Sequence, residues 1–417
     1  MREMKDSGIE WAGVIPNTWN INKGKYFMEL LTRPTLETDE VITCFRDGEV
    51  TLRSKRREEG FTVSLTEAGY QGIEIGDLVV HGMDGFAGSI GISDSRGKAT
   101  PVLNVLDTEQ NKRYMMYLMR TMAYCELFLS LATGIRVRTC DTNWKKLREI
   151  DYILPTIPEQ KAIADFLDEQ CAEIDTLVTD IQSQIEALEE YKRSVITEAV
   201  TKGLNPDVEM RDSGVQWIGD IPAHWITHPL YFYFGVRKNK NALGLETNLL
   251  SLSYGKIIRK DINSNGGLLP ESFNTYNIIE KDDIIIRPTD LQNDKRSLRT
   301  GIAREHGIIT SAYIAMKAIK SVNLEYFHYL LHAYDVMKVF YNMGNGVRQG
   351  LNFSEFSRLM VFEPTIEEQN AIVEYLKEKC DEIDLAIAEK KQQIETIEEY
   401  KKSLIFEYVT GKKEVQA

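Results

Sequence analysis

Basic and amide side chains gather in three short segments of the C-terminal half of the chain. These segments are SYGKIIRKD, IIIRPTDLQNDKRSLRTG and GNGVRQGLNF. Arginine and lysine pair with guanine or phosphate, and asparagine and glutamine pair with adenine edges in the major groove. The sequence therefore predicts a DNA-binding surface. Its candidate residues in this half are Tyr254, Lys256, Arg259, Arg287, Thr289, Asp290, Asn293, Lys295, Arg296, Arg299, Arg348 and Gln349.

Two further basic segments, LRSKRREEG and GIRVRTCDTNWKKLR, lie in the N-terminal half. A Gly-x-Arg pattern occurs at the same place in both halves, ending at Arg136 and at Arg348, which favours a shared binding role. A single run of charge is more often a solvated surface, so this second interpretation stays open for the run from Arg53 to Arg57. The candidate residues in this half are Arg53, Lys55, Arg56, Arg57, Arg136, Arg138, Asn143 and Lys145.

Motifs for catalysis or metal binding are poorly matched. The segment GISDSRGKA has one residue too many between its glycines for a phosphate-binding loop, and Ala99 stands where a Ser or Thr would bind magnesium. Asp290, Asp294 and Lys295 match a metal-dependent nuclease only loosely. The five cysteines form no CxxC pattern, and no cluster of cysteines with histidines is visible in the sequence, so no zinc site or disulfide framework is indicated. We therefore expect no catalytic residue, metal or cofactor in this chain.

The elements that must position the candidate residues are duplicated. EQKAIADFLDEQCAEID begins at Glu159, and EQNAIVEYLKEKCDEID begins at Glu368. MKDSGIEWAGVIPNTW, from Met4, likewise recurs as MRDSGVQWIGDIPAHW, from Met210. The chain is thus organised as two half-units in tandem, each with an opening motif, a variable block and a long acidic segment.

Each long segment predicts one long helix. Its apolar residues recur every three or four positions, as Leu167, Cys171 and Ile174 do. The sequences TIPE and TIEE place a Glu three residues after a Thr, which predicts a capping box at each helix start. A helix of about forty residues is far longer than a typical globular helix and cannot bury its apolar stripe alone. We expect the two helices to pair as an antiparallel coiled coil.

The variable blocks combine strand and helix signals. IEIGDLVVHG and IIEKDDIIIRP predict strands, and RYMMYLMRTMAYCELFL and LEYFHYLLHAYDVMKVFY predict buried helices. The predicted fold class is α+β, with two globular domains in tandem, two long helices and an internal pseudo-twofold repeat. The predicted segments are a first domain at 1–155, a first helix at 156–204, a second domain at 205–364 and a second helix at 365–417.

The negative charge of the chain is concentrated in the long segments. The whole chain carries −13. Residues 156–201 have 11 acidic and 3 basic side chains and residues 365–411 have 12 and 6, which is −14 together, so the rest carries +1. The acidic total therefore does not exclude a DNA partner. No run of eighteen apolar residues and no signal peptide is visible, so a cytoplasmic protein without membrane contact is expected.

These motifs together resemble the specificity subunits of type I restriction-modification enzymes. The resemblance rests on the openings DSGIEW and DSGVQW, the Gly-x-Arg patterns, the helix starts PTIPEQKAI and PTIEEQNAI, and the helix ends ITEAVTKG and FEYVTGK. The segment GLLPESFNTYNIIEKDDIIIRPTDLQNDKRSLRTG is also similar to a recurrent type of target recognition domain in that family. The first variable block matches the family only at its edges.

The resemblance implies a non-catalytic subunit in which each variable block reads one half of a split double-stranded DNA target and the helices set the spacer. It also implies two modification subunits, which use S-adenosylmethionine, and restriction subunits, which use ATP and magnesium. Two other interpretations stay open from the residues alone. One is a coiled-coil adaptor that binds protein and no DNA, and the other is the DNA-binding subunit of a fused enzyme, whose catalytic motifs this chain lacks.

Overall fold

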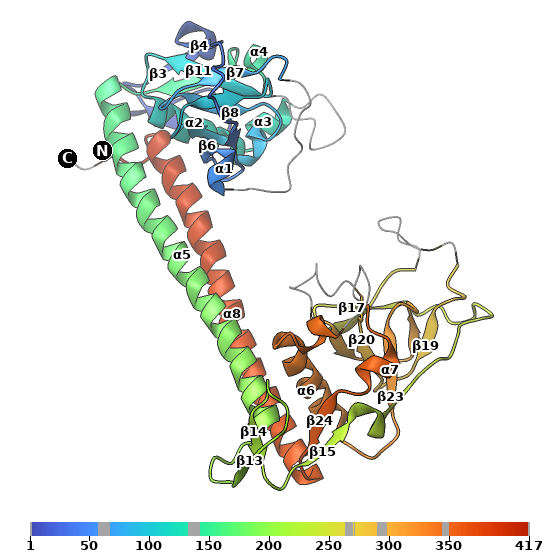
Figure 1. Cartoon of the computed structure of the whole chain (residues 1–417). Helices are drawn as coiled ribbons and strands as arrows, with labels where there is room; N and C mark the ends of the chain where they lie inside the picture. The colour runs from blue at the N-terminus through green and yellow to red at the C-terminus, as the bar shows by residue number, and fades with distance from the viewer. Residues whose placement is uncertain are drawn as a thin grey trace. The chain divides into compact units, whose positions relative to one another are not determined.

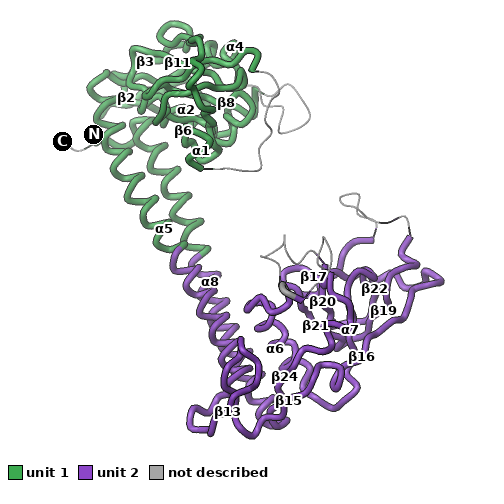
Figure 2. Tube along the Cα trace, in the orientation of Figure 1, with its two compact units in different colours: residues 1–182, 391–417 green, residues 183–390 purple. Residues whose placement is uncertain are grey.

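The chain forms two compact units, which Figure 2 shows in different colours. The computed structural model describes residues 2–56, 67–131, 142–262, 270, 272–289, 298–343 and 350–415. Unit 1 comprises Met1–Gln182 and Lys391–Ala417, and unit 2 comprises Ser183–Lys390. Each unit therefore holds one variable block and a part of both long helices.

Unit 1 is built from short antiparallel strands and a buried helix (Figure 1). Its strands are β1 (Met4–Asp6), β2 (Val14–Pro16), β3 (Asn20–Lys23), β4 (Met28–Leu30), β5 (Ile42–Cys44), β6 (Val50–Leu52), β7 (Gln71–Ile73), β8 (Leu78–His81), β9 (Ile90–Ile92), β10 (Gly97–Ala99), β11 (Leu103–Thr108) and β12 (Asp151–Leu154). Its short helices are α1 (Arg53–Arg56), α2 (Lys112–Tyr124), α3 (Leu127–Ser130) and α4 (Trp144–Leu147).

Unit 2 has twelve described strands that correspond in order to those of unit 1, and its main helix again follows the eleventh strand. Its strands are β13 (Met210–Asp212), β14 (Asp220–Pro222), β15 (Ile226–Pro229), β16 (Phe234–Val236), β17 (Leu250–Ser253), β18 (Lys256–Arg259), β19 (Asn277–Ile279), β20 (Ile284–Ile286), β21 (Thr300–Ile302), β22 (Gly307–Ile309), β23 (Ile314–Ala318) and β24 (Met360–Glu363). Its short helices are α6 (Leu324–Val336) and α7 (Phe353–Phe356).

The strand pairings of unit 1 recur in unit 2. The four-stranded sheet β4-β11-β8-β9 corresponds to β16-β23-β20-β21. The pairs β5/β6, β7/β10 and β3/β12 correspond to β17/β18, β19/β22 and β15/β24. The two variable blocks therefore share one topology, although their sequences have little in common.

Alternation along the central strand explains how the sheet of each unit is covered on both faces. In unit 1, Leu78 and Val80 join the core that contains α2, whereas Val79 joins a second apolar cluster. In unit 2, Ile284 joins the α6 core and Ile285 joins the second cluster. Successive side chains of a strand point to opposite faces, so a wholly apolar strand fits this position. Both helices that the sequence predicts to be buried are confirmed as α2 and α6.

The two long helices predicted from the repeat are present as α5 (Ile157–Lys202) and α8 (Ile366–Val409). In unit 1, Lys401 Nζ lies 2.6 Å from Asp175 Oδ1 across the two helices. In unit 2, Lys192 Nζ lies 2.6 Å from Asp384 Oδ1, and Lys390 Nζ lies 2.6 Å from Gln184 Oε1. Within unit 2 the partner's number falls as the residue number rises, so the helices run in opposite directions there.

The second helix start has both hydrogen bonds of the predicted capping box, and the first has one of them. The Thr156 N–H donates to Glu159 Oε2 at 3.2 Å. The Thr365 N–H donates to Glu368 Oε2 at 3.0 Å, and the Glu368 N–H donates to Thr365 Oγ1 at 3.3 Å. These bonds satisfy backbone donors that a helix start leaves free. No helix in the described residues is long and apolar enough to cross a membrane.

In unit 1 the variable block packs against the end of α8 as well as the start of α5. The buried Tyr114 hydroxyl of α2 lies 3.0 Å from Ile153 O and 3.1 Å from Val409 O. Beyond Val409, Gly411 has a φ of +70°, a conformation that favours glycine after a helix end. A Cβ on Gly411 would lie 2.4 Å from Pro16 Cγ, so only glycine allows this close approach.

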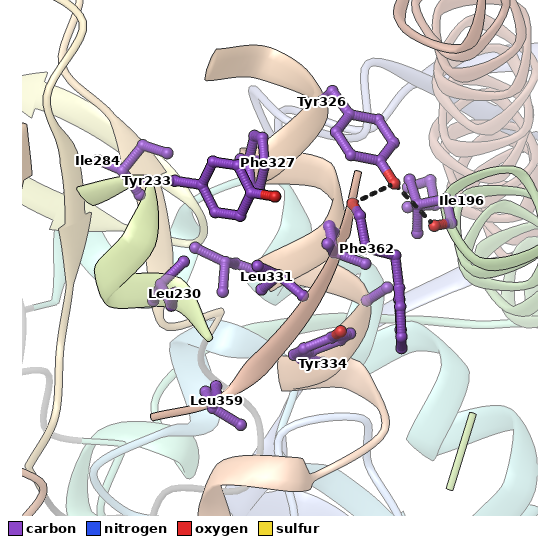
Figure 3. Packing of buried hydrophobic residues seen from close by; sticks show 14 of the residues in the cluster. Ile196, Leu230, Tyr233, Ile284, Tyr326, Phe327, Leu331, Tyr334, Leu359 and Phe362 are labelled. Atoms are coloured by element: carbon purple, nitrogen blue, oxygen red, sulfur yellow. Dashed lines mark hydrogen bonds between the residues drawn. The ribbon is translucent and has the colours of Figure 1, made fainter. Parts of the chain in front are cut away.

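In unit 2 the variable block packs against the end of α5 in the same way. The Tyr326 hydroxyl of α6 lies 3.2 Å from Val200 O and 3.1 Å from Phe362 O (Figure 3). Gly203 follows with a φ of +76° and packs against the Trp225 ring. Each variable block thus binds the start of the helix that follows it and the end of the helix from the other half of the chain.

Candidate nucleic-acid interface

The hairpin of β17 and β18 presents an aromatic and a basic side chain at its tip. Tyr254 and Gly255 form its two-residue turn with φ values of +46° and +77°, as a turn of type I′ requires. A tyrosine in this conformation is uncommon, because a side chain is strained there. Tyr254 is 80% exposed, and Lys256 beside it is also exposed. The pair is suited to a base or sugar contact combined with a phosphate contact.

Arg259, at the other end of β18, is less available. Its Nε lies 2.8 Å from Glu305 Oε1, and the Asn248 side chain donates to the same carboxylate. The hydrogen bond and the charge of Glu305 raise the pKa of Arg259, and the hydrogen bond from Arg259 lowers the pKa of Glu305. DNA would have to compete with Glu305 for this guanidinium.

Three candidate residues of unit 2 lie at the two ends of the link between β20 and β21. Thr289 is exposed and Arg287 is half-buried, as expected of surface contacts. Arg299 is fully buried. Its position does not match the expectation of direct contact with DNA, because its guanidinium donates to backbone carbonyls, with Nη1 2.7 Å from Thr289 O. The Arg299 side chain is therefore bonded to backbone carbonyls inside unit 2 and does not face the solvent.

The basic run in unit 1 forms the short helix α1, which carries Arg53, Lys55 and Arg56. Lys55 Nζ lies 3.0 Å from Asp94 Oδ2 and 2.8 Å from Ser95 Oγ. Burial opposes ionisation of Asp94, but hydrogen bonds from Ser95 and Lys55 prevail and lower its pKa. The Lys55 charge is therefore neutralised locally.

Arg56 is held in a similar way. Its Nη1 lies 2.7 Å from Asp47 Oδ2 and 2.9 Å from Glu49 Oε2, and its guanidinium lies 4.2 Å from the centre of the Phe45 ring. The local acids offset the attraction of this helix for phosphate, which favours the solvated-surface interpretation for α1.

Asn143 and Lys145 lie at the start of α4. The Asn143 side chain accepts the Lys146 N–H at 3.2 Å and so caps this helix. Lys145 is exposed on its first turn. Asn143 therefore has a structural role, and Lys145 is the more available of the two for DNA. The remaining candidates lie outside the described residues: Arg57, Arg136, Arg138, Asp290, Asn293, Lys295, Arg296, Arg348 and Gln349.

Sequence reasoning misses a pair of buried histidines behind the β17–β18 hairpin. His328 and His332 lie one turn apart on α6 and line a cavity of about 510 Å³ within unit 2. Burial lowers the pKa of each to about 4, and a hydrogen bond to the Thr300 backbone only partly offsets this for His328. Both rings are therefore neutral at pH 7. Their four-residue spacing was the available signal, but nothing nearby in the sequence marks it.

Comparison with known proteins gives two relatives from Methanocaldococcus jannaschii. The putative type I restriction enzyme MjaX specificity subunit is 26% identical over 321 residues, which cover 74% of this chain and 71% of the relative. The type I restriction enzyme MjaVIII specificity subunit is 26% identical over 325 residues, which cover 73% of this chain and 72% of the relative. The chain is thus a relative of type I specificity subunits. No protein-family model matches it.

The fold of a type I system component is also similar. A solved structure concerned with complex assembly and conformational transition of the type I R-M system contains a chain that superposes with a TM-score of 0.67. The match has 11% identity and covers 95% of this chain and 99% of that chain. At this identity the likeness shows the fold alone. The resemblance to type I specificity subunits, first seen in the repeats and helix caps, is confirmed by the two sequence relatives.

Proposed function

We propose that this chain is the DNA-binding specificity subunit of a type I restriction-modification complex. The variable block of each unit reads one half of a bipartite double-stranded target. The observation that carries the proposal is the recurrence of one strand order in two units whose surfaces differ. Two domains with the same strand order and different surface residues suit a chain that recognises two different DNA half-sites. The relatives, which are specificity subunits, support this function over an adaptor that binds no DNA.

The long helices act as the spacer in this proposal. We infer that the two blocks are target recognition domains in tandem and that α5 and α8 form an antiparallel coiled coil. The cross-helix contacts Lys401–Asp175 and Lys192–Asp384 support the pairing. Because a helix advances about 1.5 Å per residue, a change of helix length would change the unspecified spacer between the half-sites.

The chain serves as a non-catalytic platform for partner proteins. Two modification subunits, which use S-adenosylmethionine, dock on the repeated helix ends, and restriction subunits, which use ATP and magnesium, join through them. The support is that each variable block contacts the helix ends in the same way. The Tyr114 hydroxyl bonds the end of α8 in unit 1, and the Tyr326 hydroxyl bonds the end of α5 in unit 2. Matched ends offer two equivalent places for two copies of one partner.

Selection from random DNA tests this function. The full chain, co-purified with its modification subunit, is mixed with random-sequence duplexes, and the retained fraction is sequenced over several rounds. We expect two defined half-sites separated by an unspecified spacer of fixed length. Retention of unselected DNA, or of one continuous motif, would contradict the proposal. The modification subunit alone is the control and should select no split motif.

A further inference from the structure

The Arg299 side chain of unit 2 ties together the two sides of one link in the sheet. This link runs from the end of β20 to the start of β21. The Arg299 Nη1 group donates to Thr289 O at 2.7 Å and lies 3.5 Å from Arg287 O. The Arg287 N–H in turn donates to Arg299 O at 2.9 Å. The side chain and the backbone of Arg299 therefore bond the two ends of the link to each other. These two ends, residues 287–289 and 298–299, are called the neck.

Arg299 is itself fixed from the helix behind it. Its N–H donates to the Asp335 carboxylate of α6 at 2.6 Å, and both residues are buried. A buried guanidinium or carboxylate is stable only when hydrogen bonds satisfy it, so loss of one member disturbs the other. The neck thus has a defined position relative to α6.

A second segment of unit 2 is attached to the same neck. The Leu351 N–H donates to Pro288 O at 2.9 Å. The sequence predicts DNA contacts at Asp290, Asn293, Lys295 and Arg296 within the link, and at Arg348 and Gln349 just before Leu351. These six residues lie outside the described residues. The described residues next to them, Thr289 and Leu351, are both hydrogen-bonded to residues of the neck.

Unit 1 closes the matched neck without an arginine. There the Thr142 hydroxyl lies 2.9 Å from His81 O and 3.0 Å from Gly82 O. The register places Ser89 of unit 1 at the position of Arg299, because Leu78 pairs with Ile92 as Ile284 pairs with Ile302. Only residues 82–89 separate β8 from β9, whereas residues 287–299, of which 290–297 lie outside the described residues, separate β20 from β21. The buried arginine thus accompanies the longer, more basic link.

We propose that Arg299, supported by Asp335, is a positioning residue for DNA reading by unit 2. It fixes where the link leaves the sheet and does not contact DNA. This inference rests on the proposed function. Base contacts need a side chain placed to within about half an ångström. The Arg299 Nη1 group reaches both carbonyls from the end of a rigid, planar guanidinium, whereas a lysine would place a compact, strongly hydrated ammonium on a flexible stem. Loosening the neck would therefore weaken discrimination between bases more than it weakens folding.

The test uses the full chain in complex with its modification subunit. Methylation rates are measured on the selected target and on duplexes with single base changes in either half-site. For Arg299→Lys we expect discrimination at one half-site to fall about tenfold, the size of one good base contact, with discrimination at the other half-site almost unchanged and the complex still folded. Ser89→Ala, at the matched position of unit 1, should leave both half-sites unchanged.

Unchanged discrimination at both half-sites, or an equal loss at both, would overturn the inference. If Arg299→Lys does not fold, Asp335→Asn decides in its place: it should weaken discrimination at a single half-site, and an effect on both or on neither contradicts a positioning role. Failure of the proposed function would look different, since the wild-type complex would then methylate no split motif.

Discussion

The two units share a strand order but differ in how a hairpin meets the helix behind it. In unit 1, Arg120 of α2 donates to Gly48 O in the β5–β6 turn at 2.9 Å and to Ile90 O in β9 at 2.7 Å. In unit 2, the ninth residue after the helix N-cap is His332 in place of Arg120. The cavity of about 510 Å³ lies there, between α6 and the β17–β18 hairpin.

This difference shows that one strand order can carry a hairpin bonded to a helix side chain or a hairpin with a cavity between it and the helix. The turn of unit 1 is fastened by a guanidinium and flanked by cations that local acids neutralise. The turn of unit 2 has an exposed tyrosine and lysine, with space behind them. Divergence between the two units therefore extends to the side chains that lie beneath each hairpin.

Removal of the Arg120 anchor should give the largest effect. Arg120→Ala leaves the Gly48 and Ile90 carbonyls without their charged donor, so the free energy of unfolding of unit 1 should fall by about 3 kcal/mol. Urea unfolding and amide hydrogen exchange of the β5–β6 turn measure this change. Wild-type exchange rates in the variant would show that the anchor is unimportant.

The buried histidines predict that acid weakens unit 2. The folded-state pKa of His328 is about 4 and its ordinary value is 6.5, so the unfolded chain takes up the proton first as pH falls. Stability is thus fully present above pH 6.5 and is lost as pH falls from 6.5 to about 4, by about 2 kcal/mol at pH 5. Unit 1 has Met116 at this position, so His328→Met should flatten the pH dependence of unfolding. An equally steep dependence in this variant would contradict the assignment.

Transfer of the unit 1 anchor into unit 2 should have a smaller effect of the same sign. Burial and the nearby Lys192 and Arg193 disfavour a cation at His332, so the guanidinium of His332→Arg should cost more than one hydrogen bond to a carbonyl returns, and the free energy of unfolding should fall by about 1 kcal/mol. Thermal unfolding and hydrogen exchange near Gly255 report the change. A rise in stability would mean that the cavity of unit 2 can hold the unit 1 anchor.

Surface lysines should give the smallest effects. Lys256→Ala should weaken DNA binding and reduce the salt slope of binding by about one. Lys55→Ala should change the slope much less, because Asp94 and Ser95 already bind that ammonium. Binding of the selected duplex at several salt concentrations compares the two. Equal slopes for both variants would remove the distinction drawn between the two hairpins.

The repeat made much of the fold predictable. Helices α5 and α8, their caps at Thr156 and Thr365, and the buried helices α2 and α6 all follow from local patterns of apolar and capping residues. Such patterns depend on neighbours within a few positions, which a single sequence displays.

The site was less predictable because burial depends on distant partners. Arg299 stands in a basic run and looks exposed, but Thr289, Asp335 and the strand register bury it. Lys55 looks free for DNA until folding brings Asp94 to it. Charge in a sequence therefore indicates a binding surface, while only the folded contacts separate cations that face the solvent from cations already bound.

The most direct test of the account is a map of adenine methylation in a host that expresses this chain with its modification subunit, compared with the same host lacking the chain. Two units that each read one half-site predict new methylation at one split motif with a spacer of fixed length. New methylation at a continuous motif, or none despite a soluble complex, would contradict it.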